Sequence, residues 1–154
     1  MGFLKRRIRK LLLRLLKPLF DELSMGTHRL YGSTERLKIS PNALVTNTLF
    51  NTYSGEIMIG ENVFTGHNVS MITGAHNYNL KNLERMAVEP KEGNDIIIEN
   101  GVWIGSNVVI IGPCNIGAHS VIAAGAIVTR NIPTGVIAGG IPARVIKTIS
   151  FQEG

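Results

Sequence analysis

Between Ile98 and Pro133 the chain repeats with a period of six residues, and this period limits the possible folds more than any other feature. An aliphatic residue opens each hexad, and a residue that is mostly small or apolar follows four positions later. The openers are Ile98, Ile104, Ile110, Ile116, Ile122 and Val128, and the later residues are Val102, Val108, Cys114, Ser120, Ala126 and Ile132. An α-helix would space apolar residues three or four apart, and a hairpin protein would alternate with period two. A period of six predicts a prism-like β-helix in which each hexad is one short strand and a corner, with the opener pointing inward.

The repeat extends upstream in a less regular form. Hexads beginning at Ile59 keep the same register, with small or apolar residues at the expected places. Before them the register slips by two near residues 56–58, and Asn51 is a poor interior residue. We therefore expect regular coils over residues 59–74 and 98–133, and less regular coils before them.

Composition suits a β-helix with narrow coils. The 154 residues are enough for one domain with its own core. Glycine is frequent, with 17 residues, whereas aromatic residues make up only 6% of the chain. Because a solenoid leaves flat faces and open ends that need covering, we expect an oligomer. The single cysteine, Cys114, argues against a disulfide framework, and its place in a hexad indicates a small buried residue.

Basic residues are concentrated at the N-terminus. Seven of them precede the first acidic residue, Asp21, whereas the rest of the chain has nine basic and eleven acidic residues. The formal net charge of +5 therefore describes a basic segment on a mildly acidic body. A nucleic-acid-binding protein would instead carry a basic stripe on its folded surface, so this class is disfavoured.

The basic segment has the pattern of an amphipathic helix. Apolar residues recur three and four apart between the charges, at Leu4, Ile8, Leu11, Leu12, Leu15, Leu16 and Leu19. Arg14 and Lys17 interrupt the apolar run, which excludes a membrane span and an ordinary signal peptide. Two compatible interpretations remain: the helix lies on an anionic membrane surface, or it caps the open end of the solenoid. We place this helix at residues 1–24 and the β-helix at residues 25–154.

The repeat is broken once, by a polar excursion over about residues 76–94. In a solenoid, such an insertion is where function usually concentrates. His76 lies where the excursion begins, whereas His67 and His119 lie within ordinary hexads and His28 precedes the repeats. This placement makes His76 the candidate functional histidine.

Five motifs in this order resemble those of the hexapeptide-repeat acyltransferases, over residues 57–149. They are Ile59-Gly-Glu-Asn-Val63, Thr73-Gly-Ala-His76, Gly101-Val-Trp-Ile-Gly-Ser106, Ala124-Gly-Ala-Ile-Val-Thr-Arg130 and Gly139-Gly-Ile-Pro-Ala-Arg-Val-Ile-Lys147. The match is to the branch of galactoside, maltose and polysaccharide O-acetyltransferases. It implies an all-β fold, a left-handed parallel β-helix. It also implies a homotrimer that binds acetyl-CoA between subunits, with no metal.

The resemblance also implies roles for single residues. His76 matches the base that takes a proton from the attacking hydroxyl, as neutral imidazole can at pH 7. Ser106 matches the position whose backbone N–H faces the thioester carbonyl. Trp103 matches an aromatic wall of the site, although a purely structural role is the alternative.

The remaining site residues follow from the same resemblance. Ala124 is expected to lie along the pantetheine arm, and four further residues match contacts to the nucleotide end of CoA. These are Thr129, Arg130, Arg144 and Lys147, and for Lys147 a solvated surface role is equally compatible. For the acceptor, the candidates are Asn51 and Tyr78. The galactoside branch has Pro and further histidines after the catalytic His, whereas Asn77 and Tyr78 follow here, so the identity of the acceptor does not carry over.

The resemblance thus implies an acetyl-CoA-dependent O-acetyltransferase that acts on a carbohydrate, a surface polysaccharide or its lipid-linked precursor. We expect it in the cytoplasm, at the inner face of the membrane if the basic helix binds there. Alternatives are a sugar or sugar-nucleotide N-acetyltransferase, which would usually carry a nucleotide-binding domain ahead of the β-helix, and a non-catalytic trimeric scaffold, which would not bind CoA. A zinc-dependent hydratase on this fold would need a third matching histidine.

Overall fold

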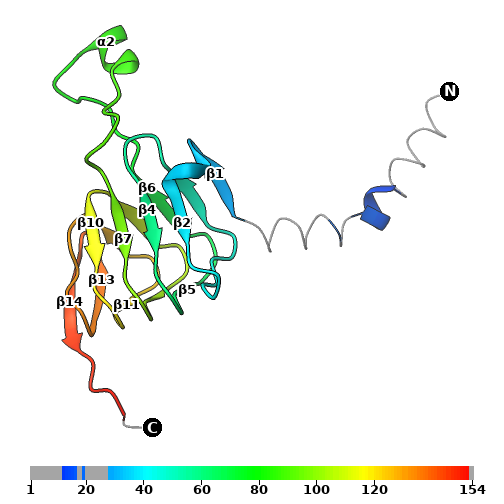
Figure 1. Ribbon diagram of the computed structural model, residues 1–154, viewed down its shortest axis with the longest axis vertical. Helices are drawn as coiled ribbons and strands as arrows, with labels where there is room; N and C mark the ends of the chain where they lie inside the picture. The colour runs from blue at the N-terminus through cyan, green and yellow to red at the C-terminus, as the bar shows by residue number, and fades with distance from the viewer. Residues whose placement is uncertain (1–11, 17–18, 20–27, 153–154) are drawn as a thin grey trace.

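The computed structural model describes residues 12–16, 19 and 28–152 of the chain. Short strands form three sheets, in which every neighbouring pair is parallel except the last (Figure 1). Sheet I holds β1 (Arg29–Tyr31), β3 (Leu49–Asn51), β6 (Ser70–Ile72), β9 (Val109–Ile111) and β12 (Ile127–Val128). Sheet II holds β2 (Leu37–Ile39), β4 (Ile57–Ile59), β7 (Ile96–Ile98) and β10 (Cys114–Ile116). Sheet III holds β5 (Phe64–Thr65), β8 (Trp103–Ile104), β11 (Val121–Ile122), β13 (Val136–Gly140) and β14 (Ala143–Thr148).

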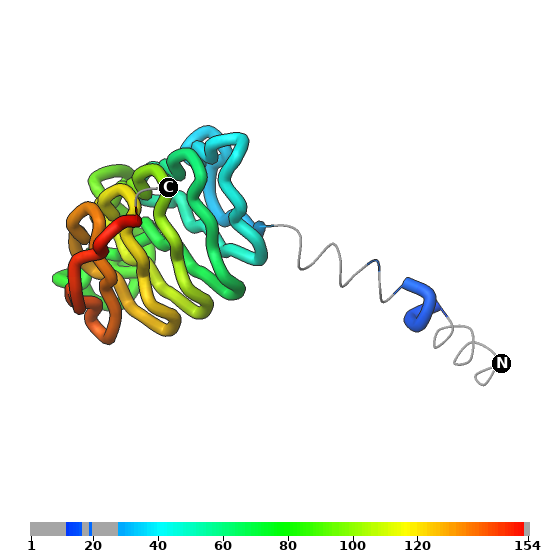
Figure 2. Tube along the Cα trace, turned by 90° about the horizontal axis from the view of Figure 1, so that it is seen from below, coloured from blue at the N-terminus to red at the C-terminus, as the bar shows by residue number. Residues whose placement is uncertain are grey.

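The chain visits sheets II, III and I in turn and so builds coil upon coil. Strands β4, β5 and β6 make one coil, and β7, β8 and β9 make the next. Ile96 pairs with Ile57 in the coil on one side and with Cys114 on the other. Figure 2 shows these coils stacked side by side. The predicted parallel β-helix is therefore confirmed, with one strand and one corner per hexad.

The core consists of the residues that the hexads place inside. All six openers from Ile98 to Val128, and all six residues four positions after them, are at most 5% exposed. Phe50 and Met71 are fully buried in earlier coils. Burial of an aliphatic side chain stabilises the fold by about 1.5–3 kcal/mol, so each opener in the column makes a substantial contribution.

The first coils depart from the hexad pattern because polar side chains fill part of their interior. Phe50, rather than Asn51, points inward from β3, and Thr48 and Thr52 are buried beside it. The hydroxyl of Thr48 lies 3.2 Å from that of Thr65 and forms a hydrogen bond with it. These hydroxyls satisfy one another or backbone groups, so they can replace aliphatic residues without leaving unpaired polar atoms.

Asparagine residues occupy several corners of the prism, where the chain turns from one sheet to the next. Asn47, Asn62, Asn68 and Asn107 have φ between 46° and 59°, in the left-handed region that disfavours most side chains. Asparagine tolerates this region because its short polar side chain can bond locally. The side chain of Asn68 receives a hydrogen bond from Asn47 and donates one to Asn107, at 3.3 and 3.5 Å, so the corners are tied from coil to coil.

The insertion leaves the body between β6 and β7 and projects from it (Figure 1). It contains one short helix, α2 (Asn82–Ala87), which the polar sequence does not predict. A second short helical turn, η1 (Thr34–Arg36), connects β1 to β2. At the other end of the stack β14 folds back antiparallel on β13, and Phe151 packs edge-on against His119 with ring centres 5.9 Å apart.

Most of the predicted N-terminal helix lies outside the described residues. Residues 12–16 and 19 are helical. Their leucines, at positions 12, 13, 15, 16 and 19, are 40–67% exposed, so within this single chain they do not pack into an end cap. No helix in the described part of the chain has the length and apolar character needed to cross a bilayer.

Candidate functional site

His76 lies at the rim of a small cavity at the corner between sheets I and II. This cavity, which we call the His76 cavity, has a volume of about 220 Å³. Its lining combines the end of β3, the start of the insertion and the returning arm of the insertion. The residues are Asn51, Tyr53, Gly74, Ala75, His76 and Glu89.

Hydrogen bonds fix the backbone directly before His76. The side-chain oxygen of Asn51 accepts from the N–H groups of Tyr53 and Gly74, at 3.2 and 3.1 Å. The N–H of Ala75 donates to the hydroxyl of Ser54, at 3.3 Å. Glycine is required at position 74 because a Cβ there would lie 2.6 Å from the Asn51 oxygen. The insertion therefore begins from a rigid point, and His76 is the first side chain beyond it that reaches solvent.

A carboxylate accompanies the imidazole of His76. The Oε1 atom of Glu89 lies 3.8 Å from Nε2 of His76, and the two side chains are 36% and 50% exposed. This distance suits an ion pair with protonated imidazole and is too long for a hydrogen bond. The sequence does not predict that Glu89 lies beside His76. The two residues meet because the insertion folds back on itself and its returning arm carries Glu89 to His76.

A larger groove runs over sheet III and its corner with sheet I. This groove, which we call the Trp103 groove, has a volume of about 640 Å³. Small residues form its floor, and one aromatic side chain forms a wall. The lining includes His67, Trp103, Gly105, Ser106, Ala123 and Ala124.

The groove offers an unoccupied backbone donor beside small residues. Within the described chain the N–H of Ser106 makes no hydrogen bond, whereas its hydroxyl accepts from the N–H of His67 at 3.1 Å. A Cβ on Gly105 would lie 2.6 Å from the backbone nitrogen of Ala124, so only glycine lets these coils approach so closely. His67 also lines the groove, although the hexad pattern places it in an ordinary corner.

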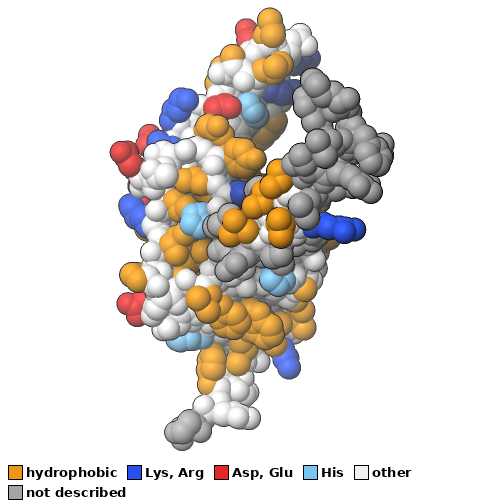
Figure 3. All heavy atoms as spheres, turned by 90° about the vertical axis from the view of Figure 1, so that its right-hand side faces the viewer, with side chains coloured by type: hydrophobic (Ala, Val, Ile, Leu, Met, Phe, Trp, Pro, Cys, Tyr) orange, Lys and Arg blue, Asp and Glu red, His pale blue; other side chains and the backbone are white. Residues whose placement is uncertain are grey.

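Trp103 belongs to an outward-facing apolar column on sheet III. Its ring stacks on that of Phe64 with centres 5.7 Å apart and planes inclined by 16°. Strand pairing continues the column to Leu44 on one side and to Val121 and Ile137 on the other. Figure 3 shows exposed hydrophobic side chains on the face of the molecule that is turned to the viewer. Trp103 therefore faces outward from the prism and takes no part in its core.

The other predicted cofactor contacts lie in two places, on strand β14 and after strand β12. Arg144 lies on β14 opposite Gly139, which in turn lies close to Ala123 of the groove. Lys147 lies further along the same exposed strand. Thr129 and Arg130 are exposed after β12, outside the Trp103 groove.

The structure brings together only part of the predicted site. Asn51 and His76 share a cavity, and Trp103, Ser106 and Ala124 share a groove, but the cavity and the groove lie at different corners of one chain. Tyr78 lies outside the His76 cavity and is 81% exposed, and Tyr53, which the sequence analysis does not single out, lines the cavity instead.

The single cysteine, Cys114, is buried and is not a candidate nucleophile. Burial raises the pKa of the Cys114 thiol to about 11, so the group is neutral at physiological pH. Because the thiolate is the nucleophilic form, Cys114 acts as a small interior residue, as its hexad position predicts.

Residues 95–130 match the family described as bacterial transferase hexapeptide (six repeats). The galactoside O-acetyltransferase of Escherichia coli K12 is 38% identical over 125 residues, which are 80% of this chain and 58% of that protein. The chain therefore spans less than two thirds of this curated relative.

Two solved structures share the fold over most of the chain. A maltose O-acetyltransferase from Clostridium difficile 630 superposes with a TM-score of 0.58 at 30% identity, over 81% of this chain and 68% of that one. A hexapeptide-repeat acetyltransferase from Vibrio cholerae, complexed with acetyl-coenzyme A, superposes with a TM-score of 0.56 at 25% identity, over 90% and 79% of the two chains.

Proposed function

This chain belongs to the bacterial transferase hexapeptide family, and we propose that it is an acetyl-CoA-dependent O-acetyltransferase that acts on a carbohydrate hydroxyl. The observation that carries this proposal is the position of His76, an accessible imidazole held at the rim of a cavity by a fixed backbone. The relatives named for acetyl transfer to galactosides and maltose support the reaction class.

In the proposed reaction His76 removes the proton from the acceptor hydroxyl as the hydroxyl oxygen attacks the thioester carbon. The C–S bond then breaks, and CoA leaves as the thiol with the proton that His76 returns to it. Positioned general bases of this kind contribute roughly 10²–10⁴ in rate. The Glu89 carboxylate, 3.8 Å away, stabilises the positive charge that the imidazole gains. The Nδ2 group of Asn51, which donates to no described residue, is free to hold the acceptor in the same cavity.

The Trp103 groove is the proposed donor site. The shallow floor of small residues suits the narrow pantetheine arm, and the free N–H of Ser106 can donate to the oxyanion that forms on the thioester. Arg144, Lys147, Thr129 and Arg130 are the proposed contacts to the nucleotide end, where guanidinium groups suit both phosphate and the adenine ring. The neighbour complexed with acetyl-coenzyme A supports this choice of donor.

We propose a homotrimer in which His76 of one subunit meets the Trp103 groove of the next. This arrangement would complete a site whose two halves lie at different corners of one chain. The outward apolar column on sheet III supports self-association, because soluble monomers rarely leave such patches uncovered. The family relationship further supports left-handed winding of the coils.

The N-terminal segment supports a location at the inner face of a membrane. Its seven basic residues and exposed leucines suit an anionic surface, and each basic residue near such a surface adds about 1 kcal/mol. That location would favour a surface polysaccharide or its lipid-linked precursor as acceptor.

The proposal is tested by following CoA release from acetyl-CoA with a panel of sugars, amino sugars and lipid-linked saccharides. Hydroxyl acetylation in the products, identified by mass spectrometry and alkaline lability, is the expected result. Acetylation confined to amines would favour an N-acetyltransferase, and failure to bind CoA would favour a scaffold.

A further inference from the structure

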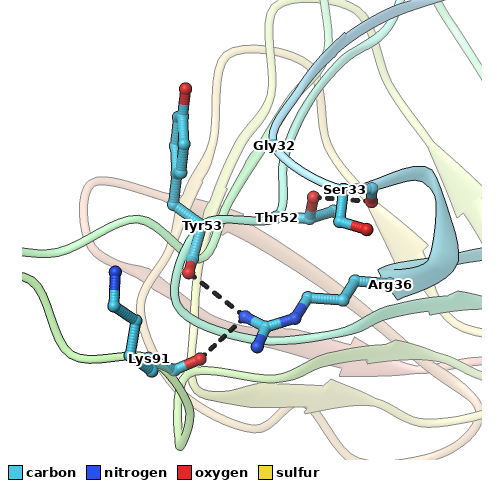
Figure 4. Close-up of a pocket in the computed structure, with 6 residues that line it drawn as sticks. All are labelled: Gly32, Ser33, Arg36, Thr52, Tyr53 and Lys91. Carbon is cyan, nitrogen blue, oxygen red and sulfur yellow. Dashed lines mark hydrogen bonds between the residues drawn. The ribbon is translucent and has the colours of Figure 1, made fainter.

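A second cavity adjoins the His76 cavity and is lined by two cations without acidic residues. This cavity, which we call the Arg36 cavity, has a volume of about 530 Å³ (Figure 4). It lies between the β1–β2 connection, the end of β3 and the returning arm of the insertion. Its lining residues are Gly32, Ser33, Arg36, Thr52, Tyr53 and Lys91.

Arg36 is held in place through one of its nitrogen atoms. Nη1 donates to the carbonyl oxygens of Tyr53 and Lys91, at 3.2 and 2.7 Å, and so joins the body to the insertion. The rest of the guanidinium group makes no hydrogen bond within the described residues, and Figure 4 shows the group among the residues that line the cavity, reaching toward the carbonyl oxygens of Tyr53 and Lys91. It is therefore positioned, with donors still available.

The positive charge of this cavity is not balanced locally. Across the described residues no carboxylate forms an ion pair with Arg36 or Lys91, and the sequence neighbours Glu35 and Glu92 do not line the cavity. Arg36 is half-buried, and a partly desolvated guanidinium group without a counter-charge favours binding of an anion. Carboxylate and phosphate oxygens both suit its planar donors.

The two cavities share their walls. Tyr53 lines both, and the returning arm of the insertion contributes Glu89 to the His76 cavity and Lys91 to the Arg36 cavity. A saccharide whose hydroxyl approaches His76 can therefore extend past Tyr53 toward Arg36.

We infer that the acceptor is an acidic carbohydrate whose carboxylate or phosphate group binds between Arg36 and Lys91 while its hydroxyl faces His76. This inference rests on the proposed function and adds the charge of the substrate. The cationic cavity selects the acceptor without taking part in proton transfer, so its loss should affect KM more than kcat.

Binding is tested first, on the full chain, because it does not depend on turnover. Galacturonate and galactose 1-phosphate are titrated calorimetrically against galactose, which has the same ring without the charge. We expect the charged sugars to bind more tightly, and salt to weaken their binding. A preference for one of the two would distinguish a uronic acid from a sugar phosphate.

Lys91→Gln is the informative variant because, within the described part of the chain, Lys91 makes a hydrogen bond only through its backbone carbonyl, which accepts from Arg36. It should weaken binding of the charged sugars by about fivefold, the upper range for an exposed charge pair, and leave galactose unaffected. In transfer assays the same change should appear in KM for acidic acceptors. The matched control, Lys81→Gln, removes an exposed lysine of the same insertion outside both cavities.

Equal binding of charged and neutral sugars by the wild-type protein, unaltered in Lys91→Gln, would overturn the inference. If neutral sugars are acetylated as well as acidic ones, the inference fails while the proposed function stands. Absence of transfer to any acceptor, despite binding of the charged sugars, would instead count against the proposed function.

Discussion

The side-chain oxygen of Asn51 accepts a hydrogen bond from the N–H of Gly74, at 3.1 Å, and thereby ties the end of β3 to the segment that carries His76. Asn51→Ala should leave two backbone N–H groups without their partner and destabilise the fold by about 1–2 kcal/mol. Asn51→Asp keeps the acceptor oxygen but removes the Nδ2 donor. We expect it to retain thermal stability while losing turnover. Equal losses of Tm in both variants would contradict this division of roles.

His76→Ala should lower turnover by about 10²–10⁴, the range for loss of a general base. CoA affinity and sedimentation should not change, because the side chain is half exposed and supports no part of the core. His119→Asn is the matched control. It removes an exposed histidine of another corner and keeps a residue that tolerates the φ of 57° found there. A His76→Ala enzyme with near wild-type turnover would remove His76 from the mechanism.

Arg144→Ala and Arg130→Ala should each weaken CoA binding while the rate at saturating acetyl-CoA stays nearly unchanged. Contacts to a part of the donor remote from the reacting bond contribute equally in the ground state and the transition state. Among the residues that the structure describes, the side chain of Arg144 bonds only to the carbonyl of Ala143, so its removal should spare the fold. Calorimetric titration with CoA measures the effect, and unaltered affinity in both variants would place the nucleotide elsewhere.

Adjacent isoleucines provide a direct test of the hexad pattern. Ile110 is fully buried as an opener, whereas its neighbour Ile111 is 40% exposed on the outer face. Ile110→Ala should cost about 2–5 kcal/mol of unfolding free energy. Ile111→Ala should cost less than about 1 kcal/mol, because little buried volume is lost. Denaturant titration compares the two, and similar costs would contradict the assignment of inside and outside.

The N-terminal segment should bring the full chain to anionic vesicles, and salt should weaken this binding. A variant that begins at Ser24 lacks all seven of the segment's basic residues and should remain in the supernatant. It should still acetylate a small soluble acceptor, provided that its sedimentation matches that of the full chain. Equal recovery of both proteins in the vesicle pellet at low salt would exclude membrane binding by this segment.

The period of six predicts the later coils because one aliphatic opener per hexad meets the same need at each level of the stack. It predicts the earlier coils poorly, since Phe50 replaces Asn51 as the inward residue and buried threonines share the interior. Hydrogen bonds among hydroxyls, such as Thr48 with Thr65, do not appear in a hydrophobic pattern.

Some residues of the candidate site could likewise be predicted from the sequence, and others could not. His76 could be singled out from the sequence as a candidate because the break in the repeat marks its position. Glu89 and Arg36 could not, because the path of the insertion decides which returning residues meet the body. Tyr78 remains a prediction as an acceptor contact, although the structure places Tyr53 in the cavity instead.

Strand β7 pairs with β4 in register, Ile96 beside Ile57, as though the insertion between β6 and β7 were absent. The pairing of the coils therefore depends little on the length of that insertion. Doubling the length of a flexible loop adds only about 0.6 kcal/mol to the entropic cost of closing it. Mutation can lengthen, shorten or recharge the segment without disturbing the floor of the Trp103 groove. If the insertion contacts the acceptor as proposed, acceptor preference in this architecture can diverge between paralogues while the acetyl donor stays the same.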